Sequence, residues 1–395
     1  MNANERILKA LNHEEPDRVP IFEGSIDNLS ICNHFGVKYS FQGAGSALKM
    51  AYYALFGSKK LLTKLIHRIS KRKSAVKIGL KYSIELYKKI GLDMAITPLS
   101  LLPKFYNKKG YIDEYGRVIE FKKNPADNMD IGYYMGGYFK DFEDYEAFPP
   151  LDPDLITREL AYKVGKELEE ENNGKIFVIP GTMGLMEGTW EGFGLENFSR
   201  LMAHPKEMQK VFDDRGKFVV EMTKRAIEWG ETDAIYLFDD YGYKAGLFMS
   251  PRNYKKYVFP WIKEVCNVAH KSGLKVMLHS CGDILKIFED LINCGVDGIN
   301  PIEPTTANPD FDIFKLKKQY GDKVTLIGNV SPMDLADKDP DYIVSYTKKL
   351  IKEVAPGGGF ILSSGHSLNP AVKLENYLAM LETHKKYGAY PIKVN

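Results

Sequence analysis

The sequence is short of cysteine, of excess charge and of long apolar runs. Only four of its 395 residues are cysteine, which excludes a small scaffold held together by disulfide bonds. Its 54 basic and 52 acidic residues nearly cancel, which argues against a dedicated nucleic-acid-binding protein. No apolar run approaches the roughly 20 residues of a membrane span, and the N-terminus lacks the apolar core of a signal peptide. We therefore expect a soluble, reduced, cytoplasmic protein without nucleic-acid or membrane partners.

What the sequence does contain is a repeated alternation of short β-rich runs with helix-like stretches. The eight runs are Val19–Phe22, Met94–Thr97, Ile176–Pro180, Ala234–Phe238, Lys275–Leu278, Gly298–Asn300, Val324–Ile327 and Phe360–Leu362. Alternation of this kind predicts right-handed βαβ units and a parallel sheet. Eight units over 395 residues predict an α/β fold of the (β/α)8, or TIM, barrel type. A doubly wound open sheet is the alternative, but no G-x-G-x-x-G follows the first run.

Two connections are too long for a simple crossover helix, so we expect one barrel over residues 1–395 with insertions at 24–92 and 99–175. The second insertion contains a predicted β-hairpin, Tyr111–Glu120, which turns near Tyr115-Gly116. Insertions that follow barrel strands lie over the active-site face, so both are expected to form a lid or wall. A surface subdomain with its own small core is the alternative.

Polar side chains follow most of the predicted strands. In a parallel barrel these positions converge on one opening. They are Glu23, Thr97, Thr182, Asp239, Asp240, His279, Cys281, Glu303, Asn329, Ser364 and His366. The set is rich in metal-ligating and acid–base side chains.

The pair His279 and Cys281 leaves one strand end with a single residue between them. Imidazole and thiolate together suit Zn²⁺, which usually has three protein ligands in a catalytic site. We predict Glu303 as the third ligand, with His366, Asp239 or Glu187 as alternatives. A histidine that is only hydrogen-bonded beside a buried cysteine would fit the same spacing.

Other residues near the strand ends are candidates for catalysis and substrate binding. Asp239 and Asp240 are adjacent carboxylates at a strand end, so one should face the pocket while the other caps a loop. Glu187 and His366, on loops after two other strands, complete the predicted catalytic set. The predicted substrate-binding set is Glu23, Trp190, Phe193, Tyr241 and Asn329.

A basic stretch lies within the first insertion. Eleven lysine or arginine residues occur between Lys59 and Lys89, with Glu85 the single acid among them. A solvated helix face is the simplest interpretation. A docking surface for an acidic protein or a phosphate-bearing cofactor is the functional one.

Several motifs together resemble those of the uroporphyrinogen decarboxylase superfamily. They are the opening segment Glu5–Pro20, Asp239-Asp240 with Ser250-Pro251, His279–Gly282, Gly328–Val330, and Gly365-His366 with Glu375-Asn376. The resemblance runs from end to end and implies a (β/α)8 barrel. The superfamily contains porphyrin decarboxylases and corrinoid-linked methyltransferases.

Two departures from the superfamily patterns favour the methyltransferases. The decarboxylases place arginines after the first strand, where this chain has Phe22–Asp27 without any arginine. In the methyltransferases a His-x-Cys pair holds zinc, which corresponds to His279 and Cys281. The thiol-methylating members add a cysteine after the last strand, where this chain has Ser363–His366.

The resemblance therefore implies a corrinoid-dependent methyltransferase that takes a methyl group from a methoxylated aromatic donor. The sequence shows no Asp-x-His-x-x-Gly corrinoid motif, so the corrinoid is expected on a separate protein, with the basic stretch as a candidate dock. The expected partners are that corrinoid-binding protein and a small-molecule methyl donor, and a homodimer is left open. The alternatives are a methylcobalamin:thiol methyltransferase, a decarboxylase of a porphyrin-like acid, and a non-catalytic corrinoid- or tetrapyrrole-binding protein.

Overall fold

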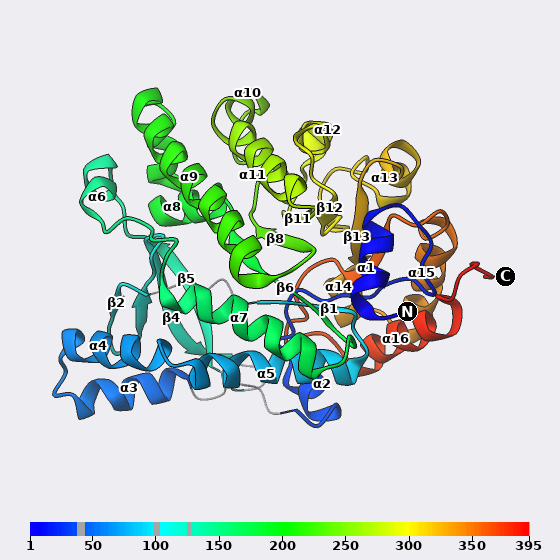
Figure 1. Cartoon of the computed structure of the whole chain (residues 1–395), viewed down its shortest axis with the longest axis horizontal. Coiled ribbons are helices and arrows are strands. Elements are labelled where there is room, and N and C mark those ends of the chain that lie inside the picture. Colours follow the sequence, from blue (N-terminus) through cyan, green and yellow to red (C-terminus); the bar gives the residue numbers. More distant parts are fainter. Residues whose placement is uncertain (38–43, 98–102, 125–127, 129, 395) are drawn as a thin grey trace.

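The structure, a computed structural model, describes residues 1–37, 44–97, 103–124, 128 and 130–394 (Figure 1). Short parallel strands recur along the chain with helices between them. The parallel strands are β1 (Met94–Ile96), β6 (Phe177–Ile179), β7 (Gly181–Met183), β8 (Ala234–Phe238), β11 (Lys275–His279), β12 (Gly298–Asn300), β13 (Thr325–Val330) and β14 (Phe360–Ser364). They pair in the order β14-β13-β12-β11-β8-β7, with β1 paired to β6. Pro180, which has no backbone N–H, separates β6 from β7.

Hydrogen bonds of the first extended segment close these strands into a ring. The N–H of Phe22 donates to the carbonyl of Leu362 on β14, and the N–H of Asp93 donates to the carbonyl of Ile21. The carbonyl of Pro180 accepts from Tyr236 on β8, which joins β6 to the larger sheet. The predicted (β/α)8 barrel is therefore confirmed, and the open-sheet alternative is wrong. The predicted first strand is reduced to a single parallel bridge between Ile21 and Leu362.

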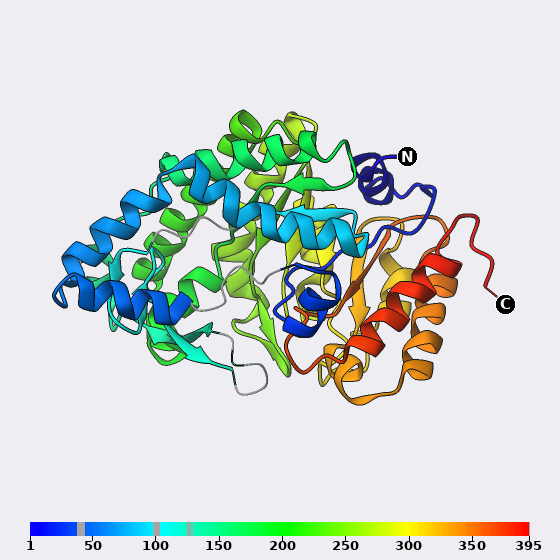
Figure 2. The same cartoon turned by 90° about the horizontal axis from the view of Figure 1, so that it is seen from below.

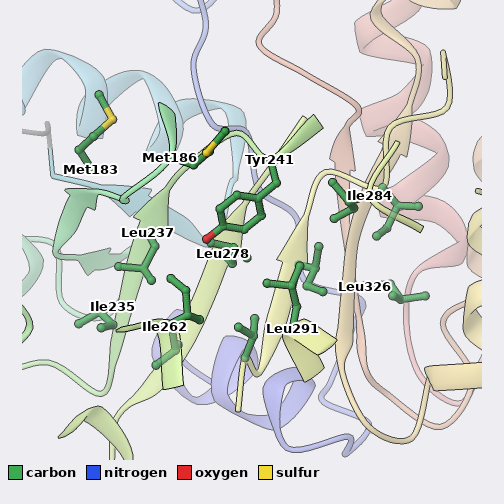
Figure 3. Packing of buried hydrophobic residues seen from close by; sticks show 14 of the residues in the cluster. Met183, Met186, Ile235, Leu237, Tyr241, Ile262, Leu278, Ile284, Leu291 and Leu326 are labelled. Carbon is green, nitrogen blue, oxygen red and sulfur yellow. The ribbon is translucent and has the colours of Figure 1, made fainter. Parts of the chain in front are cut away.

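The barrel has a closed end and a core of two layers. Helix α1 (Ala3–Leu11) packs Ile7 and Leu11 against strand side chains that point into the barrel, such as Met277. The outer layer packs strand side chains against helices, as with Leu237 of β8 and Ile262 of α11 (Figure 3). The surrounding helices are α5 (Lys73–Ile90), α7 (Ile156–Glu171), α8 (Glu187–Leu201), α9 (Pro205–Gly230), α11 (Phe259–Lys271), α12 (Leu285–Cys294), α13 (Ile313–Tyr320), α14 (Pro332–Asp337), α15 (Pro340–Glu353) and α16 (Leu374–Tyr387).

The local sequence explains why these helices begin and end where they do. Helix α12 buries Ile287, Phe288 and Leu291 on one face and ends at Gly295, whose φ of 101° is left-handed. Asp312 caps α13 by accepting hydrogen bonds from the first-turn N–H groups. Such local signals make the alternation of strands and helices readable from the sequence.

Much of the two insertions lies together on one side of the barrel, at the left in Figure 2. The first forms α2 (Leu29–His34), α3 (Ala44–Ala54) and α4 (Lys59–Ser70), and leads into α5. The second forms an antiparallel sheet of β2 (Phe105–Tyr106), β3 (Gly110–Ile112), β4 (Arg117–Lys123) and β5 (Asp130–Gly137), followed by α6 (Phe142–Ala147). The predicted hairpin is confirmed, because β3 pairs with β4 across a turn at Gly116, where φ is 86°. His67 of α4 contacts the carbonyl of Pro103 at 2.6 Å, which ties the insertions to each other.

The remaining elements are short and belong to the loops. They are β9 (Gly242–Tyr243), β10 (Gly246–Leu247), α10 (Pro251–Asn253) and a π-helix at Tyr254–Val258. All four cysteines are free thiols, and Cys32, Cys266 and Cys294 are buried. Among the helices that the structure describes, none combines the length and the apolarity needed to cross a membrane.

Candidate metal centre

The carboxyl ends of β8 and β11 bring together three side chains that suit a metal ion. Asp240 follows β8, His279 ends β11, and Cys281 lies two residues further on. The Cys281 thiol is 3.3 Å from Nε2 of His279, and that nitrogen is 3.9 Å from Oδ1 of Asp240. One ligand atom from each residue lies within 4.8 Å of the others. Within the described part of the chain, this is the single such trio of histidine, cysteine and carboxylate side chains.

The hydrogen bonds around His279 leave its Nε2 available to a metal. Nδ1 of His279 lies 2.9 Å from Oδ1 of Asn300, at the end of β12. The same amide oxygen accepts a hydrogen bond from the Tyr236 hydroxyl at 2.6 Å. An acceptor at Nδ1 selects the tautomer that carries its proton there, so the lone pair of Nε2 points toward Cys281 and Asp240. The residues present therefore fit a zinc ion.

The electrostatics of the cluster also suit a cation. Burial raises the pKa of the Cys281 thiol well above its usual value, and the carboxyl groups of Asp240, Glu303 and Glu187 raise it further. Burial likewise raises the pKa of Asp240 and of Glu187, and the charge of Asp240 raises the pKa of Glu187 further. Removing several acidic groups from water costs free energy that a bound cation would offset.

The structure gives the two adjacent aspartates different roles. Asp239 is fully buried and accepts hydrogen bonds from the backbone N–H groups of Leu185, Met186 and Glu187, at 2.6 to 3.1 Å. These contacts hold the loop that starts α8. Asp240 accepts the N–H of Cys281 at 2.7 Å and belongs to the metal cluster. Asp239, predicted as catalytic, is therefore a positioning residue by its contacts.

Two of the other predicted acids lie beside the cluster without joining the trio. Glu303, predicted as the third ligand, accepts the N–H of Gly282 at 2.6 Å and the hydroxyl of Thr305 at 2.7 Å. Asp240 takes the third place in the trio instead. Glu187 begins α8, and Arg117 of β4 lies 3.8 Å from its carboxylate.

Three further predicted residues come from strands on the other side of the barrel. His366 follows β14, and burial lowers its pKa, with the imidazole of His279 lowering it further. Glu23 is fully buried and accepts hydrogen bonds from the N–H and hydroxyl of Ser364. Burial raises the pKa of Glu23 to about 8. Asn329 lies within β13 rather than after it, and accepts the hydroxyl of Tyr346 at 2.9 Å.

The three predicted aromatic residues are packed into protein. Tyr241 points into the core between the barrel and its helices (Figure 3) and is 0% exposed. Phe193 is 1% exposed and packs against Phe139 with ring centroids 5.2 Å apart. The core covers both rings, so their role in binding substrate stays a prediction. Trp190 stacks on Phe248 at 4.8 Å.

Comparison with known proteins identifies the family. A sequence model described as uroporphyrinogen decarboxylase (URO-D) matches residues 130–387. The chain belongs to the URO-D family. The structure of a methyltransferase from Methanosarcina mazei superposes with a TM-score of 0.67 and 18% sequence identity, covering 98% of this chain and 99% of that one. This likeness supports the barrel fold over the whole chain.

Curated relatives of this URO-D family member carry two kinds of name. A uroporphyrinogen decarboxylase of Coxiella burnetii is 27% identical over 162 residues, which are 40% of this chain and 41% of the relative. One from Chlorobaculum tepidum is 25% identical over 60% of this chain and 68% of the relative. The methylcobamide:CoM methyltransferase MtaA of Methanosarcina barkeri is 31% identical over 29% of this chain and 31% of its own length. The match thus spans about two fifths of the Coxiella relative and less of MtaA.

The sequence did not single out three residues that shape this site. Asn300 and Tyr236 orient His279, and Arg117 joins the second insertion to Glu187. Asn300 ends a predicted strand, and that position could have marked it as a candidate site residue. Nothing in the local sequence of Arg117 indicates its partner, because Glu187 lies 70 residues away in the chain.

Proposed function

We propose that this protein transfers a methyl group from a methoxylated aromatic donor to the Co(I) of a separate corrinoid protein. The observation that carries the proposal is the cluster of Asp240, His279 and Cys281 at the carboxyl ends of β8 and β11. The likeness to a methyltransferase structure and to MtaA supports the same reaction class. The segment after the first strand supports it too, because Glu23 stands where a porphyrin carboxylate would need an arginine.

The reaction breaks the bond between the methyl carbon and the ether oxygen. The methyl carbon forms its new bond to cobalt with the electron pair of Co(I). The electron pair of the broken bond stays on the aryl oxygen, which then needs a proton or another positive partner to leave. A Zn²⁺ ion held by His279, Cys281 and Asp240 would supply a Lewis acid for that oxygen.

The chain's own acids suit the proton transfer. Burial and the neighbouring carboxylates raise the pKa of Glu187, which favours its protonated form. Glu187 is 21% exposed at its side chain, so it keeps access to the opening while Arg117 holds it from the other side. In this proposal Glu187 gives its proton to the departing oxygen, and Asn300 keeps the imidazole of His279 in the metal-binding tautomer.

We propose that the two insertions form a wall of this site and that the first also binds the corrinoid protein. On α4, Leu61, Leu65 and Ile69 are 46%, 38% and 45% exposed, and their spacing puts them on one face. Lysine and arginine side chains surround this face, at Lys60, Lys64 and Arg68. A second copy of the chain would bring like charges together, so an acidic partner protein fits better.

A methylcobalamin:thiol methyltransferase is the second candidate. The His-x-Cys pair and the likeness to MtaA favour it. The segment Ser363–His366, which spans the end of β14, provides no cysteine as a further ligand.

An anaerobic assay separates these functions. The purified protein is mixed with a reduced corrinoid protein and a panel of methoxyarenes, and absorbance follows conversion of Co(I) to methylcobalamin. Methylation that requires a methoxyarene supports the proposal. Demethylation of methylcobalamin by a thiol would support the second candidate, and turnover of a porphyrinogen with no methyl transfer would replace both with decarboxylation.

A further inference from the structure

A cavity of about 770 Å³ lies between α5, the four-stranded sheet of the second insertion and the barrel. Its volume falls within the range of about 300 to 1,000 Å³ that is typical of small-molecule sites. The described lining residues include Val76, Leu80 and Ile84 from α5, and Phe121 and Ile131 from the sheet. The walls are thus mainly apolar and come from both insertions.

Small residues on α5 create much of this space. Ala75, Gly79 and Ser83 line the cavity and are spaced four residues apart, so they share one face of the helix. A Cβ atom added at Gly79 would meet nothing within 4 Å. Glycine in a helix interior costs about 1 kcal/mol relative to alanine. The helix therefore bears this cost at a position where the missing side chain leaves room beside the sheet.

The cavity reaches the side of the metal cluster. Phe238, the last residue of β8, lines it, and the Phe238 ring centroid is 6.1 Å from that of His279. Gly24 and Thr97, which follow the first two strand segments of the barrel, line it as well. The cavity thus ends at the barrel opening beside Phe238, and a molecule in it would extend past that ring for its methoxy group to reach His279 and Glu187.

The polar groups of the cavity indicate the charge of its ligand. Tyr106 and Tyr111 line it, and burial raises the pKa of both, so both hydroxyls stay protonated and can donate hydrogen bonds. The charged residues among the described lining are Asp27 and Asp130, and Asp130 is paired with Lys123 at 3.0 Å. Neither lysine nor arginine occurs in that lining, so an anion would find no cationic partner there. Such a wall would disfavour carboxylates and sulfonates and would accept an uncharged ring that carries ether or hydroxyl oxygens.

We propose that this cavity binds an uncharged methoxylated aromatic molecule. This inference rests on the proposed function, because it assigns the methyl donor of that reaction to a definite place. It also specifies the class of donor: a neutral arene rather than an aromatic acid.

Binding of 1,2-dimethoxybenzene by isothermal titration calorimetry, with zinc-loaded protein and no corrinoid, tests the inference. The matched anion is 3,4-dimethoxybenzoate. A Cβ atom fits at Gly79, so Gly79→Phe should place its ring in the cavity and weaken binding of the neutral probe at least tenfold. Gly79→Ala should change the dissociation constant of the neutral probe less than threefold. Ile78→Phe, at a 60% exposed position on the same helix, is the control and should bind like the wild type.

The outcomes separate this inference from the proposed function. Equal binding by Gly79→Phe and the wild type, or binding of the benzoate as tight as that of the neutral probe, would overturn the cavity assignment while methyl transfer could still be observed. If the neutral probe binds and its binding depends on Gly79, but no corrinoid protein is methylated, then the proposed function is wrong and the cavity assignment stands.

Discussion

The backbone N–H of Cys281 donates a hydrogen bond to Oδ1 of Asp240 over 2.7 Å, although the residues end different strands. This contact fixes the loop after β11 against the loop after β8. It sets the thiol and carboxylate beside Nε2 of His279. The cluster is therefore built by the pairing of β8 with β11. The two adjacent aspartates, Asp239 and Asp240, can be tested separately.

Asp239 and Asp240 should respond differently to the same substitution. Asp239→Asn places an amide NH₂ among four backbone N–H donors, so we expect about 2 kcal/mol of destabilisation from the lost charge-assisted hydrogen bonds. Asp240→Asn should keep the unfolding free energy within about 1 kcal/mol and weaken zinc binding at least tenfold. Urea unfolding and zinc titration check both. If Asp239→Asn weakened zinc binding and Asp240→Asn destabilised the fold, the two assigned roles would have to be exchanged.

Asn300 should act on the metal through His279. Asn300→Ala removes the acceptor at Nδ1, so zinc affinity should fall about 10- to 100-fold while His279 itself is intact. Asn300→Asp keeps an acceptor oxygen and should restore most of the affinity. Competition with a zinc chelator measures both. If Asn300→Ala binds zinc as tightly as the wild type, then the amide does not orient the imidazole.

Glu23 should make stability depend on pH. Its folded-state pKa is raised to about 8 from an ordinary value of 4.5, so the folded protein retains the proton more strongly than the unfolded chain does. This contribution to stability is complete below pH 4.5 and is lost as the pH rises through 8. Glu23→Gln removes the titrating group.

Urea unfolding at half-unit steps from pH 5 to 8.5 checks this dependence. The difference in unfolding free energy between Glu23→Gln and the wild type should shift by about 2 to 4 kcal/mol in favour of the variant across that range. A difference that stays constant with pH would show that Glu23 is ionised in the folded protein.

Charge reversal on α4 should weaken the corrinoid protein's binding. We expect the triple variant K60E/K64E/R68E to raise the KM for the corrinoid protein at least tenfold with little change in kcat, because electrostatic attraction mainly affects association. The triple variant K352E/K385E/K386E, at exposed positions on α15 and α16, is the control. Equal KM values for the two variants would place the dock elsewhere.

Much of the barrel could be predicted from the sequence because its signals are local. Each β-rich run and each helix stop, such as Gly295, depends on neighbouring residues. His279 and Cys281 could be paired because they share one strand end. The division of labour between Asp239 and Asp240 was foreseen only in general terms. It depends on N–H groups more than 50 residues earlier in the chain.

The burial of Tyr241 and Phe193 and the cavity beside Gly79 could not be predicted for a related reason. An aromatic residue after a strand can face either the opening or the helices, and its sequence neighbours do not decide which. Tyr241 faces the helices, where Tyr254 packs against its ring at 5.6 Å. The cavity exists only because α5, which ends at Ile90, lies against a sheet that begins at Phe105. Both features require tertiary packing.

The metal content of the purified protein tests the central claim most directly. Mass spectrometry of the elements should find about one zinc per chain in the wild type. It should find less than a tenth of that in Cys281→Ala and in His279→Ala, with the thermal unfolding midpoint of each variant little changed. Wild-type protein that is free of zinc after growth and purification with zinc, or zinc retained in full by both variants, would contradict the assignment of Asp240, His279 and Cys281 as the metal centre.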